Sequence, residues 1–127
     1  MKIRSINARN RNLSREQSLW HPLFLQLKPA ARAVEQYFRN LSRDKRLKIY
    51  DFGCGQKPYQ VYLENHDYIG IDIDEMNTQA DIHSDISNVP IPDNTADIVT
   101  SFYVLEHVPE PQKVIDEKYR ILKNGGE

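Results

Sequence analysis

The chain has 127 residues and a net charge of −1; 39% of the residues are hydrophobic, and the mean hydropathy is −0.67. These values are typical of one soluble globular domain, and no apolar run approaches the roughly 18 residues that cross a bilayer. The basic N-terminus has no apolar stretch behind it, so we expect no secretion signal and a cytoplasmic protein. The single cysteine, Cys54, excludes an intrachain disulfide and a multi-cysteine zinc site.

Charge divides the chain into two parts. Residues 1–48 hold 12 Lys and Arg against 3 Asp and Glu, whereas residues 49–127 hold 5 against 15. Such asymmetry can mark an anionic partner. The arginines are scattered, however, which favours a solvated helical face or mutual attraction of the two parts. Residues 1–48 also lack the combination of basic and aromatic side chains on which nucleic-acid bases stack, so we predict no nucleic-acid partner.

The first 46 residues predict a tail and two amphipathic helices. Residues 1–13 have no periodicity and are interpreted as a mobile tail. Ser14 begins a capping box and predicts the start of a first helix, in which Pro22 is a point of kinking. Pro29 suits the first turn of a second helix, along which apolar residues recur every three or four positions. We expect residues 14–46 to form a helical cap on the rest of the domain.

From residue 47 onward, short apolar runs alternate with loops and helical patterns. Four runs predict strands: 47–53, 67–74, 80–85 and 96–103. Residues 57–65 are compatible with a helix, and 111–123 predict a helix with Gly125 as its C-cap. Strands separated by helices or loops in this order indicate an α/β fold with a parallel sheet.

The first predicted strand ends in Asp51 and the turn Gly53-Cys54-Gly55. Glycines at the carboxyl end of a parallel strand let a ligand approach the backbone without meeting a Cβ. A dinucleotide site would have a third glycine where this chain has Pro58, so a nicotinamide oxidoreductase is disfavoured. Asp51 suggests a ligand that carries donors or positive charge. A purely structural turn is the alternative for the glycine pair.

Two more carboxylates follow the second and third predicted strands. Asp72 lies 19 residues after Gly53, at a strand tip from which it can accept hydrogen bonds from two ribose hydroxyls. A helix N-cap or a solvated loop carboxylate is the alternative. Asp85 can accept a hydrogen bond from the exocyclic amine of a base, with Ile86 as an apolar surface beside it. Alternatively, Asp85 only caps the next turn.

Four segments together resemble the class I S-adenosylmethionine-dependent methyltransferases: DFGCG, YIGID, SDI and ADIVTSFYVLEHV, within residues 47–127. The resemblance implies a Rossmann-like, doubly wound α/β fold with a mainly parallel sheet. It implies transfer of a methyl group by in-line displacement, with S-adenosylmethionine as cofactor, S-adenosylhomocysteine as product and no metal. The GCGQKPY segment is similar to members that modify cell-surface sugars or lipids in bacteria. A small-molecule or cell-surface-precursor acceptor is therefore the class it suggests.

The resemblance also implies roles for particular residues. Four would line the methionine end of the cofactor: Asp51, Gly53, Cys54 and Gly55. Four would hold the nucleoside: Asp72 at the ribose diol, Ile73 beside the adenine, and Asp85 and Ile86 at the adenine edge. Three would face the sulfonium: Ser101, Phe102 and Tyr103. His107 is a candidate for a general base, which is required only if the acceptor must lose a proton. The alternative is that the pair Glu106 and His107 shapes the loop after the fourth strand.

The sequence ends at KNGGE, where the resembled fold continues into a fifth strand and an antiparallel hairpin. We therefore expect residues 47–127 to form an incomplete cofactor-binding domain whose fourth strand has an open edge. Such an edge can pair with a second chain, which predicts a homodimer if the chain is not simply a fragment. The alternative function is a catalytically silent module that binds the nucleoside or supports assembly.

Overall fold

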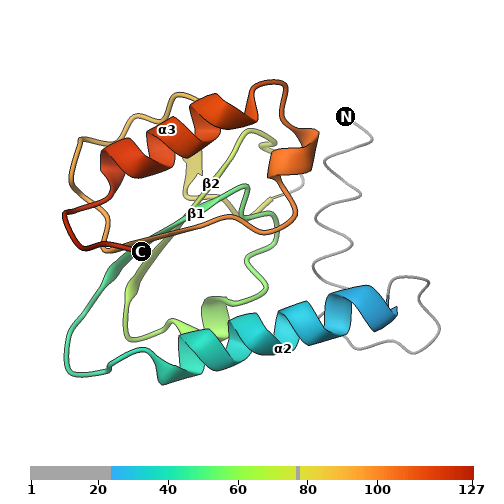
Figure 1. The fold of residues 1–127 in the computed structure, drawn as a ribbon, viewed down its shortest axis with the longest axis vertical. Helices are drawn as coiled ribbons and strands as arrows, with labels where there is room; N and C mark the ends of the chain where they lie inside the picture. The colour runs from blue at the N-terminus through green and yellow to red at the C-terminus, as the bar shows by residue number, and fades with distance from the viewer. Residues whose placement is uncertain (1–23, 77) are drawn as a thin grey trace.

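The computed structural model describes residues 24–76 and 78–127. In this part of the chain a parallel sheet lies between helices α2 (Phe24–Asn40) and α3 (Pro111–Ile121), as Figure 1 shows. Its strands, in the spatial order β3-β2-β1-β4, are β1 (Lys48–Phe52), β2 (Asp67–Asp72), β3 (Ile82–His83) and β4 (Ile98–Thr100). The predicted tail and most of the first predicted helix lie outside the described residues. Neither α2 nor α3 is long and apolar enough to cross a membrane.

Strand β1 lies at the centre of the sheet and is buried on both faces. Ile49 packs in the cluster beneath α2, whereas Tyr50 and Phe52 pack in the cluster beneath α3. Burial on both faces explains the near-continuous apolar run from which the sequence predicted a strand. The strand order reverses between β1 and β4, and open α/β sheets bind ligands at the carboxyl ends of the strands flanking such a point.

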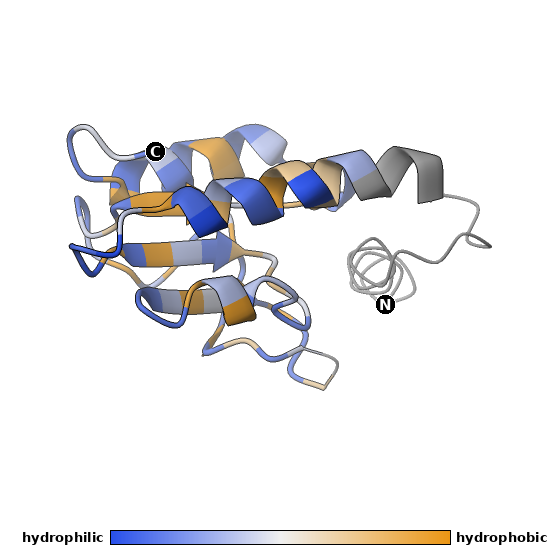
Figure 2. Cartoon of the chain, turned by 90° about the horizontal axis from the view of Figure 1, so that it is seen from below, coloured by the Kyte–Doolittle hydropathy of each residue, from blue (hydrophilic) through white to orange (hydrophobic). Residues whose placement is uncertain are grey.

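Helix α2 covers one face of the sheet, and the predicted start of this helix is wrong. Pro29 does not open the helix, because α2 begins at Phe24 and continues through the proline. A proline at this position loses one main-chain hydrogen bond of the helix. Tertiary packing compensates, since Phe38 is buried against Ile49 and Tyr59, and such packing rather than propensity holds most helices. The outer side of α2 is mostly hydrophilic (Figure 2).

The segment between β1 and β2 is mostly irregular, which corrects the predicted helix over 57–65. Only the 3-10 helix η1 (Gln60–Tyr62) forms there. Lys57 has a left-handed φ of 51°, which a right-handed helix starting at this residue cannot include. Tyr59 and Leu63 are buried against α2 instead.

Helix α3 covers the opposite face, as predicted, with Val114 and Ile121 buried against the sheet. Gly125 is not its C-cap. The helix ends at Ile121, and its C-cap, Leu122, is extended and forms a parallel bridge with Ala96. Gly125 lies at φ 79° in the following turn. The prediction fails because Leu122 pairs with Ala96 at the edge of the sheet, and this pairing ends the helix before Gly125 is reached.

The residues after this turn pair with the outer edge of β4. The N–H of Glu127 donates to Asp97 O (3.1 Å), and its main-chain oxygen accepts the N–H of Val99 (2.8 Å). The Tyr37 hydroxyl of α2 donates to the Glu127 carboxylate (2.5 Å). Burial and this carboxylate raise the pKa of Tyr37 to about 12. Pairing of this edge with a second copy of the chain stays a prediction.

Arg120 of α3 fixes the loop between β3 and β4. Its guanidinium donates to the main-chain oxygens of Val89 (3.2 Å) and Ile91 (2.8 Å) and pairs with the carboxylates of Glu117 (2.7 Å) and Asp93 (2.6 Å). Glu117 in turn accepts the N–H of Val89 (2.8 Å). Hydrogen bonding from Arg120 lowers the pKa of Glu117 below its ordinary value of 4.5. The loop is thereby held on the helix, and its apolar residues complete the core.

We expect Glu117→Gln to lower the free energy of unfolding by about 1–3 kcal/mol near neutral pH, because it leaves the partly buried Arg120 without its principal carboxylate. The folded state lowers the pKa of Glu117. Its contribution is therefore complete above the ordinary pKa of 4.5 and is lost as the pH falls through the folded-state pKa. Denaturant midpoints of wild type and Glu117→Gln between about pH 3 and pH 7 measure how this contribution to the free energy of unfolding changes with pH.

The matched control is Asp116→Asn, whose carboxylate accepts from Gln112 rather than from Arg120. The difference between wild type and Glu117→Gln should shrink in acid, while the control stays close to wild type throughout. A difference that stays constant with pH would contradict the assignment.

Candidate functional site

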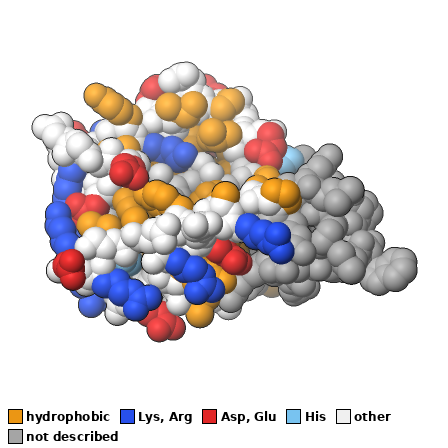
Figure 3. Space-filling view, turned by 60° about the horizontal axis from the view of Figure 1, so that its bottom comes forward, with side chains coloured by type: hydrophobic (Ala, Val, Ile, Leu, Met, Phe, Trp, Pro, Cys, Tyr) orange, Lys and Arg blue, Asp and Glu red, His pale blue; other side chains and the backbone are white. Residues whose placement is uncertain are grey.

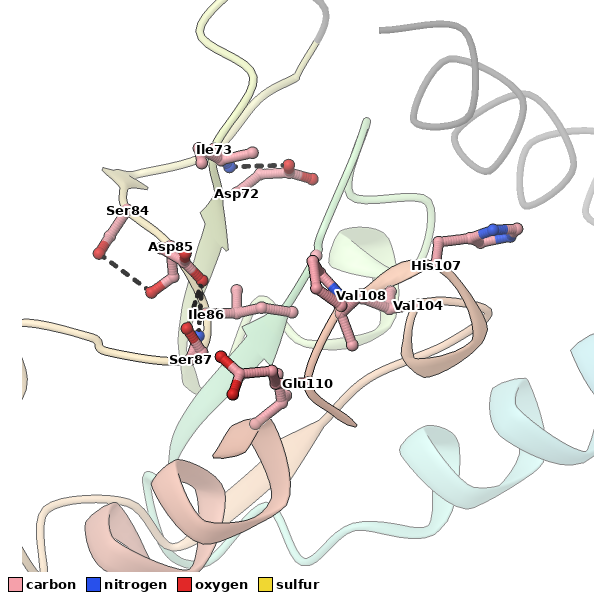
Figure 4. A pocket seen from close by; sticks show the side chains of 13 residues that line it. Asp72, Ile73, Ser84, Asp85, Ile86, Ser87, Val104, His107, Val108 and Glu110 are labelled. Carbon is pink, nitrogen blue, oxygen red and sulfur yellow. Dashed lines mark hydrogen bonds between the residues drawn. The ribbon is translucent and has the colours of Figure 1, made fainter. Parts of the chain in front are cut away.

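A pocket of about 200 Å³ lies at the carboxyl ends of β1, β2 and β3. The turn after β1, the tip of β2, the residues after β3 and the segment from β4 into α3 enclose it (Figure 4). The lining residues are Gly53, Asp72, Ile73, Ser84, Asp85, Ile86, Ser87, Val104, His107, Val108, Pro109, Glu110 and Val114. Five of the residues that the sequence proposed for a cofactor are among them: Gly53, Asp72, Ile73, Asp85 and Ile86.

Asp72 ends β2 and is anchored by main-chain donors. Its Oδ2 accepts the N–H of Gly55 (3.1 Å), and its Oδ1 accepts the N–H of Ile73 (2.8 Å). These bonds hold the carboxylate between the glycine turn and the strand tip. A carboxylate oxygen can accept more than one hydrogen bond, so Asp72 can serve the turn and a ligand together.

Asp85 follows β3 and shapes a tight turn. Its Oδ1 accepts the N–H (2.9 Å) and the hydroxyl (2.8 Å) of Ser87, and the hydroxyl of Ser84 donates to its main-chain oxygen (3.3 Å). The turn-capping role named as an alternative is thus present. The carboxylate also lines the pocket, beside buried Ile86 (Figure 4).

Apolar side chains form the opposite wall of the pocket. Val104 and Val108 come from the segment after β4, and Val114 comes from α3. Figure 4 shows Ile86 and the two valines of this segment on opposite sides of one space. A slot with apolar walls and carboxylates along one side suits a flat ring with N–H and O–H donors at its edge.

Gly53 meets two constraints at the floor of this pocket. Its φ of 74° lies in the left-handed region, and a Cβ on it would lie 2.6 Å from Val104 Cγ2. A side chain here would therefore strain the turn and fill the space beside Val104.

Asp51, before the glycine turn, and Cys54, within it, are buried and do not line the pocket. The Asp51 carboxylate accepts the hydroxyls of Tyr68 (2.5 Å) and Thr100 (3.2 Å), which come from the two neighbouring strands. Cys54 is fully buried against Gly70. Gly55 reaches the site through its bond to Asp72.

The three residues expected near the sulfonium are not among the pocket lining. The Ser101 hydroxyl accepts from the ammonium of Lys118 (2.7 Å), whose pKa burial lowers. Phe102 packs edge-on against Tyr59, with ring centroids 5.3 Å apart. Tyr103 has a left-handed φ of 55°. The chain then reaches the pocket at Val104, one residue beyond the predicted segment.

His107, the proposed base, lies in the 3-10 helix η2 (Leu105–His107) at the pocket wall. Its Nε2 is 3.7 Å from the carboxylate of Glu106. Glu110, which was not among the predicted site residues, also lines the pocket and pairs with Lys113 (2.8 Å). The proline-flanked HVPEP run was the available signal, since it must turn from β4 into α3. Within residues 24–76 and 78–127, no group of three His, Cys, Asp or Glu is placed to hold a metal.

The family model described as "Methyltransferase domain" matches residues 50–127, more than half of the chain. This chain belongs to the methyltransferase domain family. The match covers the sheet, the pocket and α3, and it confirms the family resemblance that the sequence motifs indicated. The Rossmann-like α/β fold predicted with that resemblance is likewise confirmed by the parallel sheet between two helical layers.

Curated relatives that are similar in sequence to this chain are named methyltransferases, in agreement with the family assignment. The chain is 31% identical over 103 residues to a demethylmenaquinone methyltransferase of Listeria monocytogenes, an alignment covering 65% of this chain and 43% of the relative. It is 47% identical over 45 residues to the Geobacillus protein of the same name, over 35% of this chain and 19% of the relative. The chain thus spans less than half the length of these curated relatives.

A solved structure shares the fold of this chain. It is a putative S-adenosylmethionine-dependent methyltransferase from Methanococcus maripaludis, with a TM-score of 0.66 and 22% identity. The alignment covers 99% of this chain and 62% of that one. At this identity the likeness establishes the fold, while the pocket geometry must carry the function.

We expect Gly53→Ala to lower the free energy of unfolding of this methyltransferase domain by about 2–4 kcal/mol, since a clash with Val104 adds to the strain of a left-handed alanine. Gly125→Ala is the matched control, because Gly125 has a similar φ of 79° with nothing within 4 Å of its Cβ position. Relative to Val104→Ala alone, the double variant Gly53→Ala/Val104→Ala should lose only the part due to the left-handed alanine, because the clash is gone. Equal losses in Gly53→Ala and Gly125→Ala, measured by denaturant unfolding, would contradict the clash.

Proposed function

We propose that the pocket binds the nucleoside of S-adenosylmethionine and that the chain is the cofactor-binding part of a methyltransferase. One observation carries the proposal: Asp72 and Asp85, at the ends of adjacent strands, share a pocket with an apolar wall and a glycine turn. The turn leaves room for a ligand because Gly53 has no Cβ to fill the space beside Val104. The residues present therefore fit a nucleoside.

Each lining group has a distinct task in this proposal. The carboxylate of Asp72, which the N–H of Gly55 already orients, would accept hydrogen bonds from the hydroxyls of the ribose. Asp85 would accept a hydrogen bond from the exocyclic amine of the adenine, whose ring would lie against Ile86 and Val108. When bound, the cofactor supplies a methyl group on a sulfonium, which is already activated for displacement. The protein then contributes mainly the in-line placement of the acceptor.

The acceptor proposed here is a small molecule or a precursor of a cell-surface compound, in the cytoplasm. The names of the curated relatives, demethylmenaquinone methyltransferases, support a small-molecule acceptor. The face shown in Figure 3 has no continuous basic surface of the kind that a large anionic acceptor would need, because its Lys and Arg side chains are spread among apolar and acidic ones. His107, at the pocket wall, would act as a base only for an acceptor that must lose a proton.

Titration of the chain with S-adenosylhomocysteine tests the proposal, and Asp72→Asn is the decisive variant. We expect one-to-one binding to wild type and about tenfold or greater weakening in Asp72→Asn, because charge-assisted hydrogen bonds to the ribose are lost. The amide keeps one oxygen, which can still accept the Gly55 N–H, and it loses the oxygen that accepts the Ile73 N–H. The melting temperature of Asp72→Asn is therefore measured alongside its affinity, and the comparison uses folded protein.

Asp74→Asn is the control, since the Asp74 carboxylate accepts the N–H of Met76 (3.0 Å) and does not line the pocket. Unchanged affinity in Asp72→Asn would refute the ribose assignment. A silent binding module would give the same titration as an enzyme. Transfer of a labelled methyl group to a panel of small-molecule acceptors separates the two.

A further inference from the structure

Lys57 is a buried cation two residues after the glycine turn. Its side chain is only 5% exposed, and its Nζ lies 2.6 Å from Asp81 Oδ2. Its backbone is left-handed, at φ 51°, a conformation that is uncommon for a residue with a Cβ. An ammonium without solvent is unfavourable unless it is paired, so the position of this charge is strongly constrained.

Strand β2 is built to accept this side chain. A Cβ on Gly70, in the middle of β2, would lie 2.5 Å from Cys54 Sγ and 2.9 Å from Lys57 Cε. The missing side chain lets the glycine turn and the lysine stem rest directly on the strand. Asp81 closes the arrangement, because its Oδ2 also accepts the N–H of Gly70 (2.7 Å).

The same cation reaches the buried end of the site through Tyr68. The ammonium lies 5.2 Å from the centroid of the Tyr68 ring, whose hydroxyl donates to Asp51. Asp51 also accepts from Thr100 of β4. Lys57 is thus the member of this polar group that belongs to the glycine-turn segment. The other members belong to the strands, apart from the half-exposed Asp81, which precedes β3.

We propose that Lys57 is a positioning residue that sets the height of the glycine turn over β2, and with it the fit of the cofactor beyond its ribose. The proposal rests on the proposed function. Asp72 and Asp85 hold the nucleoside, so the remainder of the cofactor extends from Asp72 toward Gly53 and Gly55. A turn released from Asp81 and Tyr68 no longer presents its backbone at the right place.

Two ligands that share a nucleoside separate this role from a merely structural one. S-Adenosylhomocysteine carries the amino-acid part, whereas 5′-methylthioadenosine lacks it. We expect Lys57→Met, which keeps the length of the stem, to weaken binding of S-adenosylhomocysteine about tenfold or more, as the loss of a supporting contact does elsewhere. Binding of 5′-methylthioadenosine should weaken much less, by about twofold, because Asp72 keeps its bond to the Ile73 N–H when its bond to Gly55 is disturbed. Both affinities are measured by calorimetric titration.

Asp81→Asn is a second, milder variant, because its amide oxygen still accepts the Gly70 N–H while the countercharge of Lys57 is gone. Asp81→Asn should likewise weaken binding of S-adenosylhomocysteine more than binding of 5′-methylthioadenosine. If Lys57→Met does not fold, this variant tests the positioning role instead. Lys123→Met is the control: it unpairs Asp97 (2.9 Å), a carboxylate before β4 and away from the pocket. The control should lower the melting temperature and leave both affinities unchanged.

Equal weakening of the two ligands, or unweakened S-adenosylhomocysteine binding in a folded variant, would overturn the positioning role. A wild-type chain that binds neither ligand would instead refute the proposed function itself. The two failures are therefore distinguishable in one set of titrations.

Discussion

The site depends on the close contact of the glycine turn with strand β2. The N–H groups of Gly53 and Cys54 both donate to the main-chain oxygen of Ile71, at 2.7 and 3.1 Å. This contact is possible only because Gly70 has no side chain where Cys54 packs. It brings the turn beside the tip of β2, and the carboxylate of Asp72 can then accept the N–H of Gly55. The pocket takes its shape from this arrangement.

Residues whose role is set by their own strand were predictable from the sequence. The apolar runs located the four strands, and Asp72 and Asp85 could be placed because parallel strands bring their carboxyl ends to one edge. Residues whose role is set by partners distant in sequence were not predictable. Pro29 lies inside α2 because Phe38 is buried against β1, and Gly125 is displaced from the helix end because Leu122 bridges to Ala96.

The segment after β4 shows the same limit at the site itself. Residues 101–103 were predicted to be neighbours of the cofactor, but Ser101 is held by Lys118 and Phe102 joins the aromatic cluster under α2. The left-handed backbone at Tyr103 then redirects the chain, so the pocket wall starts at Val104. A strand pattern gives no sign of such a reversal, because it depends on one dihedral angle and on partners in two different helices.

The burial of Cys54 gives the domain a built-in chemical reporter. Its thiol is the sole one in the chain and is fully covered where the turn rests on β2. An alkylating reagent can reach the sulfur only while the turn is lifted, so the rate of labelling measures how often the turn opens. Any ligand that spans the turn and Asp72 would slow that rate without having to touch the sulfur. The opening of the site can therefore be followed in native protein with no introduced label.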